Sequence, residues 1–203
     1  MESATVVPLS PEWVDARKRM VTASDMAAAC GLNPFCSRKK LFDMKMGFSV
    51  LEDNEYMIYG RLHEPDAINE YETITGSLVA KARFYTSEVY EGMGCTPDGL
   101  VGDPGLLEGK CPQILYHTIP VYYLSQMTGQ LALTNRMWCD FVAWTPEVTG
   151  IWHVEWSQPA WEWMLPYLKE FLGYMQERAP PPRFKRRPDG REFVELIKQE
   201  RIF

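Results

Sequence analysis

The chain has 203 residues, of which 46% are hydrophobic and 24% are charged, values typical of a globular domain rather than a disordered chain. Its formal net charge is −6, whereas proteins that coat nucleic acid with their whole surface are usually basic, so cations that meet a nucleic acid must be gathered in a groove or channel. No apolar run approaches the roughly 20 residues of a membrane-spanning helix, and we expect a cytoplasmic protein, with no membrane partner, whose five cysteines are free thiols.

The N-terminal part is predicted to hold two helices. Residues 1–9 are expected to form a loose arm. A helix start follows at 10–12, where a serine cap, a proline and an acid of the first turn coincide. Residues 22–31 predict a second, short helix that ends at Gly31.

A cationic stretch comes next, and residues 32–40 are predicted to form a loop. It carries Arg38, Lys39 and Lys40. Such cations are either simply solvated or contacts for a bound polyanion, and the sequence leaves both readings open.

A long helix is predicted over residues 54–73, with Gly76 beyond its end. Pro65 lies inside it and is a candidate kink. Residues 77–85 alternate in polarity and predict a strand.

A hairpin is predicted in the middle of the chain. Residues 99–101 and 106–110 form its arms, and Pro104 and Gly105 supply the turn. Residues 121–134 then predict a helix by length and periodicity, and residues 137–144 and 151–156 predict strands.

The last part of the chain is predicted to be largely helical. Residues 159–179 form a helix, stopped by three prolines, and a further helix is expected within 191–203. One face of the first helix carries an apolar stripe, which indicates core packing: Trp161, Leu165, Leu168, Leu172 and Met175. The mixture predicts an α/β fold with a central mixed sheet flanked by helices.

The hairpin concentrates charged side chains in apolar company. Residues two apart in a strand face the same side, so Glu108 and Lys110 point together, and the turn brings Asp98 back toward them. Two carboxylates near one point suit Mg²⁺ or Mn²⁺, and a lysine beside them can hold a water or stabilise charge on a phosphate. The same trio also occurs as an ordinary surface ion pair, although Leu106 and Leu107 indicate a half-buried strand where charges need partners.

Several segments, in chain order, resemble the phage lambda exonuclease and YqaJ-type viral recombinase family of the PD-(D/E)xK nuclease superfamily. They are 13–24 (WVDARKRMVTAS), 29–35 (ACGLNPF), 59–76 (YGRLHEPDAINEYETITG), 96–112 (TPDGLVGDPGLLEGKCP) and 122–144 (YYLSQMTGQLALTNRMWCDFVAW). The resemblance implies one nuclease domain over 1–203 with a restriction-endonuclease-like core. It does not extend to the C-terminal tail, 180–203.

The resemblance implies roles for the hairpin residues. Asp98 and Glu108 would ligate a catalytic Mg²⁺, for which Mn²⁺ is a substitute, together with the Gly109 carbonyl. Lys110 would position or activate the attacking water. Family members often have a bulkier residue where Gly109 stands.

Further site residues follow from the same resemblance. Glu64 matches an acid that contributes to a second metal position, and Gln126 matches a glutamine that helps to hold the site. Gln130, one helical turn later on the same face, is a further candidate. Without the resemblance, Glu64 is better explained as a helix-surface carboxylate, and both glutamines are equally well polar positions on a half-exposed helix.

The substrate contacts implied by the resemblance lie near the N-terminus. Arg17 and Ser24 match residues that hold a 5′-phosphate, a role that suits a guanidinium fork and a hydroxyl. The ordinary alternatives are a surface arginine and a capping serine. Arg38, Lys39 and Lys40 fall where a family loop approaches the duplex.

The resemblance implies a Mg²⁺-dependent 5′→3′ double-strand DNA exonuclease of phage or prophage origin. It would act on 5′-phosphorylated ends by two-metal hydrolysis, leave 3′ overhangs for a single-strand annealing protein, and assemble as a ring-shaped homotrimer. Two alternatives stay open: an endonuclease or RNase on the same fold, and a non-catalytic DNA-binding recombination protein.

Overall fold

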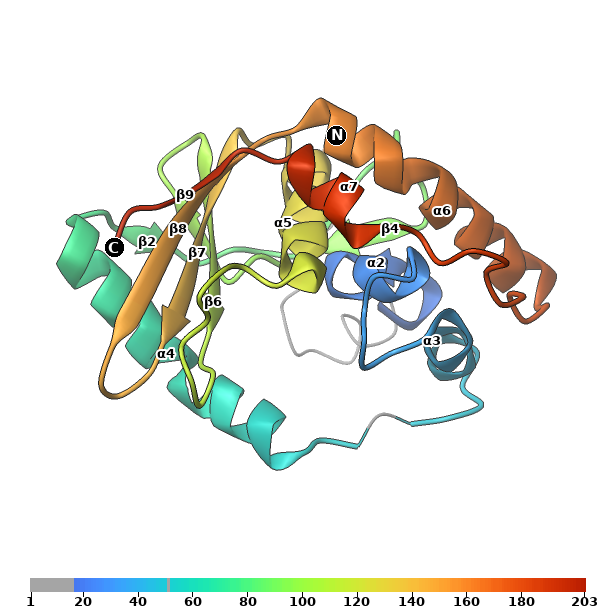
Figure 1. Ribbon diagram of the computed structural model, residues 1–203, viewed down its shortest axis with the longest axis horizontal. Helices are drawn as coiled ribbons and strands as arrows, with labels where there is room; N and C mark the ends of the chain where they lie inside the picture. Colours follow the sequence, from blue (N-terminus) through green and yellow to red (C-terminus); the bar gives the residue numbers. More distant parts are fainter. Residues whose placement is uncertain (1–16, 51) are drawn as a thin grey trace.

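A mixed six-stranded sheet forms the framework of the protein, as seen in a computed structural model that describes residues 17–50 and 52–203 (Figure 1). The strand order is β2–β5–β6–β7–β8–β9. β6 and β7 are parallel, and the other neighbours are antiparallel. The bounds are Val79–Ala80 (β2), Gly99–Val101 (β5), Gly105–Lys110 (β6), Trp138–Trp144 (β7), Thr149–Glu155 (β8) and Gln199–Arg201 (β9).

A smaller three-stranded sheet has the order β1–β4–β3. It consists of Val21–Thr22 (β1), Met93–Cys95 (β4) and Tyr85–Thr86 (β3). β1 and β4 are parallel, with Thr22 opposite Gly94. Because Asp98 comes three residues after β4, this sheet links the N-terminal segment to the hairpin.

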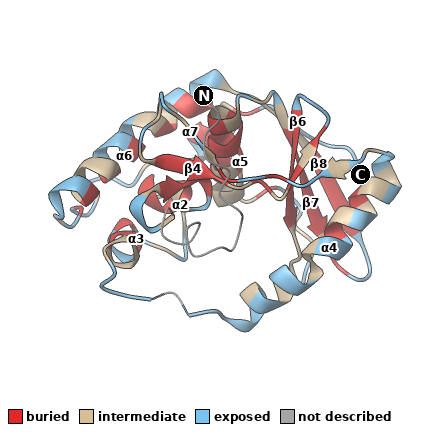
Figure 2. Cartoon of the chain, turned by 180° about the vertical axis from the view of Figure 1, so that it is seen from behind, coloured by how far each residue is buried: buried red, intermediate tan, exposed pale blue. Residues whose placement is uncertain are grey.

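Helices cover both faces of the main sheet. α4 (Glu55–Thr75) packs on one face against β6 and β7, where the core includes Ala67, Tyr71, Leu107 and Val142. On the other face lie α2 (Ala23–Ala29), α5 (Val121–Thr134) and α6 (Gln158–Glu177), and this side holds the larger core. The buried residues accordingly gather along the strands and around α2 and α5 (Figure 2). In the described part of the chain, no helix has the length and apolar character needed to cross a bilayer.

Local signals explain the helix ends that the sequence predicted. The Asn54 side chain accepts a hydrogen bond from the Met57 amide at 3.0 Å and begins α4, and Gly76 ends it with a φ of 69°. The helix continues through Pro65 as one element. Proline has no backbone N–H, so one helical hydrogen bond is lost at Pro65. The helix persists because packing on the sheet stabilises it. The arm predicted at 1–9 and the helix start at 10–12 lie outside the described residues.

Two predictions of secondary structure are wrong, and a third is confirmed only in part. Residues 38–40 belong to α3 (Arg38–Lys45) and not to a loop, since the Ser37 side chain accepts a hydrogen bond from the Lys40 amide at 3.1 Å. The strand predicted over 77–85 is divided between β2 and β3, which pair in different sheets. The helix expected within 191–203 is present as the short α7 (Gly190–Glu195), but the stretch continues into β9, which pairs with β8.

The C-terminal tail is an integral part of the fold. Phe193 on α7 is fully buried, and the backbone carbonyl of Leu196 accepts a hydrogen bond from the Ser157 hydroxyl at 2.5 Å. β9 then adds the last strand to the main sheet. Removal of this tail would therefore expose core surface.

A buried polar contact fixes α4 on the sheet and gives a testable stability prediction. The Tyr71 hydroxyl donates to the Asp140 carboxylate on β7 at 2.7 Å, and His153 on β8 contacts the other carboxylate oxygen at 2.7 Å. Tyr71→Phe leaves one oxygen of a buried carboxylate without its donor, which costs about 1–3 kcal/mol. Urea unfolding should show this loss, whereas Tyr56→Phe on the exposed side of the same helix should change the free energy of unfolding by less than about 0.5 kcal/mol. Equal effects of the two variants would contradict the assignment.

Candidate active site

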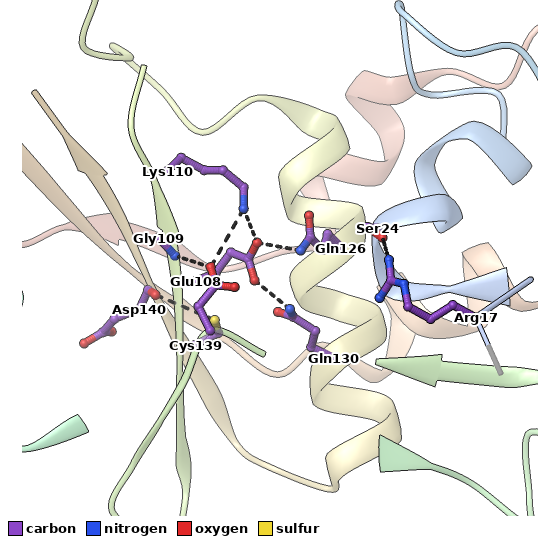
Figure 3. A network of polar contacts seen from close by, with 10 residues as sticks. Arg17, Ser24, Glu108, Gly109, Lys110, Gln126, Gln130, Cys139 and Asp140 are labelled. Carbon is purple, nitrogen blue, oxygen red and sulfur yellow. Dashed lines mark hydrogen bonds and ion pairs between the residues drawn. The ribbon is translucent and has the colours of Figure 1, made fainter. Parts of the chain in front are cut away.

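Glu108 is the centre of the candidate site. Side chains of β6 alternate, so that Leu107 packs toward α4 whereas Leu106 belongs to the core on the α5 side. Glu108 shares the α5 side and is fully buried. Both oxygens of its carboxylate accept hydrogen bonds from side chains of α5, and one of them also accepts from Lys110 on β6 (Figure 3). A buried carboxylate requires such partners.

Two glutamines of α5 hold the Glu108 carboxylate. Gln126 Nε2 donates to Oε1, and Gln130 Nε2 donates to Oε2 at 2.6 Å. Gln130 is 1% exposed, so it is not a polar residue on a half-exposed helix face. Their spacing of four residues places both amides on one face of α5, which is the face turned to β6.

Asp98 and Lys110 complete the cluster. Asp98 Oδ2 accepts a hydrogen bond from the Gly109 backbone amide at 2.9 Å. Lys110 Nζ contacts Glu108 Oε1 and lies 3.9 Å from Asp98 Oδ2. The hairpin thus brings together the three charged side chains that the sequence singled out, and Figure 3 shows Glu108 and Lys110 among them.

Burial and the mutual repulsion of carboxylates govern the electrostatics of the cluster. Burial, and then the nearby Glu108 carboxylate, raise the pKa of Asp98 to about 8, although Lys110 opposes the rise. Burial also raises the pKa of Glu64, with Glu108 adding to the rise. Burial alone would lower the pKa of Lys110, but the carboxylates of Glu108 and Asp98 raise it above its ordinary value. Three carboxyl groups therefore share one ammonium group.

This charge imbalance fits a divalent cation. Carboxylate oxygens are the ligands that Mg²⁺ and Mn²⁺ prefer, and a cation between them removes the like-charge repulsion. Asp98 and Glu108 are the first candidates for its ligands, because both carboxylates lie beside Lys110. Within residues 17–50 and 52–203, no three His, Cys, Asp or Glu side chains form a ready-made ligand group. Main-chain oxygens and waters would therefore have to complete the coordination.

The backbone at Gly109 leaves room for a Cβ atom. A Cβ at this position would lie 3.8 Å from the Ala67 Cβ and 3.9 Å from Asp98 Oδ2, which are ordinary contact distances. The glycine is thus no steric requirement of the site. Its contribution is through the backbone, whose amide holds Asp98.

A groove of about 930 Å³ adjoins the cluster and contains Glu64. Gly109 and Lys110 form part of its wall. The groove also has an aromatic wall, which consists of Phe35, Tyr56, Tyr116, Tyr122 and Tyr123. Glu64 thus shares a groove with Lys110, although it makes none of the hydrogen bonds described for the cluster.

The aromatic wall was missed in the sequence analysis. Tyr123 lies beneath the Lys110 ammonium group, 5.3 Å from its ring centre, and Phe35 packs edge-on against Tyr122 at 5.8 Å. Tyr122 and Tyr123 precede Gln126 by four and three residues, which places them on its face of the helix. That spacing is the signal that sequence reasoning had available.

Arg17 and Ser24, the residues predicted to hold a 5′-phosphate, lie in contact with each other. Arg17 Nη2 donates to Ser24 Oγ at 3.1 Å. Ser24 is not the cap of α2, since Thr22 occupies that position. Lys45 on α3 donates to the Arg17 backbone carbonyl at 2.8 Å and pairs with Asp25. The pair is thereby tied to α2 and α3, beyond α5 as seen from Glu108 (Figure 3).

The three cations predicted as duplex contacts lie apart from the groove. Arg38 is buried, bonded to Glu170 on α6 at 2.8 Å and stacked 4.4 Å from the Phe184 ring. Lys39 pairs with Asp43 at 2.6 Å, and Lys40 is exposed in the first turn of α3. Arg38 therefore joins parts of the fold instead of facing a substrate.

Comparison with known proteins gives a consistent picture. Residues 12–137 match the family described as the YqaJ-like viral recombinase domain. The fold is similar to that of an alkaline exonuclease from Laribacter hongkongensis, with a TM-score of 0.74, 29% identity, and coverage of 83% of this chain and 94% of that one. The same enzyme in complex with dAMP gives a TM-score of 0.72 and 28% identity over the same shares of the two chains.

A more distant structure agrees in fold. A phage-related exonuclease from Haemophilus somnus has a TM-score of 0.60 at 14% identity and covers 78% of this chain and 92% of that one. At this identity the likeness concerns the fold alone. A search among curated proteins finds no match.

Proposed function

The chain belongs to the family of YqaJ-like viral recombinase domains, and from that premise we propose that it is a metal-dependent exonuclease that degrades one strand of duplex DNA from the 5′ end. The observation that carries the proposal is the cluster of Asp98, Glu108 and Lys110 beside an aromatic groove. The likeness to an alkaline exonuclease at 29% identity supports the same reaction. The dAMP complex of that enzyme supports a nucleotide as the product class.

The proposed chemistry assigns a separate task to each side chain. Asp98, Glu108 and the Gly109 carbonyl would hold a divalent cation, which when bound supplies Lewis-acid stabilisation of the phosphate charge. Glu64, in the same groove, would contribute to a second cation position. Lys110 has three N–H donors, so it can contact Glu108 and still donate to a water or a phosphate oxygen. Gln126 and Gln130 would keep the Glu108 carboxylate in one orientation.

The groove suits the end of a DNA strand. Aromatic side chains offer faces on which bases stack, with little dependence on sequence. The wall that contains Tyr122 and Tyr123 lies directly beside Lys110. A nucleotide stacked there would present its phosphate to the carboxylate cluster.

The direct test uses linear duplex DNA labelled at either end, with Mg²⁺ or with a chelator. We expect metal-dependent loss of nucleotides from 5′ ends, with the 3′-labelled strand spared. Covalently closed plasmid DNA is the control, because an enzyme that needs an end leaves it intact. Cleavage of the closed plasmid would favour an endonuclease, and absence of digestion with any divalent metal would favour a binding protein.

Arg17 and Ser24 are proposed to hold the 5′-phosphate of the substrate. A charge-assisted hydrogen bond contributes about 1.5–3 kcal/mol, so Arg17→Ala should raise KM for 5′-phosphorylated duplex about 10- to 100-fold. It should have little effect on duplex that ends in a 5′-hydroxyl. Arg19→Ala, an exposed arginine two residues away, is the matched control. An equal loss on both kinds of end would remove Arg17 from this role.

Partners follow from the same proposal. A 3′ overhang is the substrate of a single-strand annealing protein, which we propose as the functional partner. A ring-shaped homotrimer would let a chain of net charge −6 hold DNA with cations that line one channel. A solution mass of three chains would support the ring.

A further inference from the structure

A cluster of positive charge follows α6 and is not used by the proposed site. Its members are Arg183, Lys185, Arg186 and Arg187. All four are exposed. The ion pairs of residues 17–50 and 52–203 do not involve any of them. In a chain of net charge −6, four cations within five residues are a marked local reversal. We call residues 183–187 the basic segment.

The basic segment is held on the fold and is not a free tail. The Phe184 ring stacks on the buried Arg38 guanidinium at 4.4 Å, and Arg38 is bonded to Glu170 on α6. Arg187 Nε donates to the Gly31 carbonyl at 2.8 Å. A Cβ on Gly31 would lie 2.6 Å from the Phe184 ring, so the two residues pack closely. These contacts fix the backbone of the basic segment on the fold, while the side chains of Arg183, Lys185 and Arg186 are exposed.

The basic segment and the groove lie at opposite ends of the turn formed by residues 31–35. Arg187 contacts Gly31 at one end of this turn, and Phe35 packs against Tyr122 at the other end. Phe35 and Tyr122 line the groove together with Lys110. In Figure 1 the red stretch between α6 and α7 passes beside α2, which leads into this turn.

We propose that the basic segment contacts the phosphate backbone of the duplex whose end lies in the groove, an inference that rests on the proposed nuclease function. Exposed lysine and arginine side chains suit a phosphate backbone, because such contacts need charge and no base recognition. The aromatic residue of the segment, Phe184, is turned inward onto Arg38, whereas the centre of a protein–protein interface would be expected to present it. DNA beyond the turn at 31–35 therefore meets Lys185 and Arg186.

The test is the salt dependence of binding. Lys185→Ala/Arg186→Ala is compared with Lys81→Ala/Arg83→Ala, a double variant that also removes one lysine and one arginine, both exposed. Arg187 is kept because it anchors the segment. The dissociation constant of a 5′-phosphorylated duplex is measured in chelator over a series of salt concentrations. Each lost phosphate contact should make the slope of log K against log salt shallower by about 0.9, so we expect a change of about 1 to 2 for the first variant and none for the second.

The outcomes separate this inference from the proposed function. Wild-type protein from the same preparation is assayed for digestion of the duplex with Mg²⁺. If it digests DNA while both variants keep the wild-type slope, the basic segment does not contact DNA, and an acidic protein becomes the candidate partner. If the wild type neither digests nor binds duplex DNA, the proposed function fails and this inference fails with it. Lys185→Glu/Arg186→Glu should weaken binding further than the alanine variant, and a smaller effect would also overturn the proposal.

Discussion

Lys110→Ala is expected to lower the rate of duplex digestion by about 10²- to 10³-fold, the loss that follows removal of one fixed donor from a charge-stabilising site. Lys110 is the cation that contacts both Glu108 and Asp98. Without it, no ammonium group remains to orient a water or offset charge on the phosphate. Single-turnover digestion with excess enzyme and Mg²⁺ measures the chemical step directly. DNA binding should persist, since the groove and its aromatic wall stay in place.

Two further variants make the Lys110 experiment decisive. Lys110→Met keeps an apolar stem of similar length and removes the ammonium group that lies over the Tyr123 ring, so it should be as slow as the alanine variant. Lys169→Ala removes an exposed lysine of α6 and should digest DNA like the wild type. Circular dichroism shows whether each variant is folded. Rates within tenfold of wild type for both Lys110 variants would exclude Lys110 from catalysis.

The grouping of the three charged residues at the centre of the candidate site could be predicted because they are close in the sequence. Asp98, Glu108 and Lys110 lie on one hairpin, and a period of two residues places Glu108 and Lys110 on one side of β6. The turn at residues 102–104 then brings β6 back beside β5, close to Asp98. The same local logic gave α5 its observed bounds, Val121–Thr134.

Features that depend on distant contacts could not be predicted. α3 begins with three cations at its N-terminus, where the helix dipole disfavours positive charge. Its first residue, Arg38, is compensated by Glu170, which lies 132 residues further along the chain. Likewise β9 forms only because β8 presents a free edge, and the tail sequence carries no sign of that edge.

Gln130 combines a feature that the local sequence predicts with one that depends on distant contacts. The sequence places it on the same helix face as Gln126. It cannot tell that this face is pressed against β6, where Gln130 becomes 1% exposed and bonds to Glu108 at 2.6 Å. The aromatic wall of the groove has the same limitation, since Phe35 and Tyr122 come from segments far apart in the chain.

Glu108→Gln is expected to abolish metal-dependent digestion, with a loss of at least about 10³-fold, equivalent to about 4 kcal/mol. The substitution keeps the shape of the side chain but removes a charged metal ligand. An amide has one accepting oxygen, whereas the carboxylate accepts from Gln126 on one oxygen and from Gln130 on the other, so one donor would face the new NH₂ group. Calorimetric titration with Mn²⁺ should show the affinity of the protein for metal falling with the rate.

The variant Glu64→Gln tests whether the site binds one cation or two. Glu64 lines the groove but does not share the hydrogen bonds that fix Glu108, so its loss should leave the first cation position intact. We expect wild-type protein with DNA bound to take up two Mn²⁺ ions, Glu64→Gln one, and Glu108→Gln none at the same concentration. Glu177→Gln, an exposed carboxylate at the end of α6, should match the wild type. If Glu108→Gln retained both ions and full digestion, the carboxylate cluster would not be the metal site, and the assignment of Asp98 and Gly109 as ligands would fall with it.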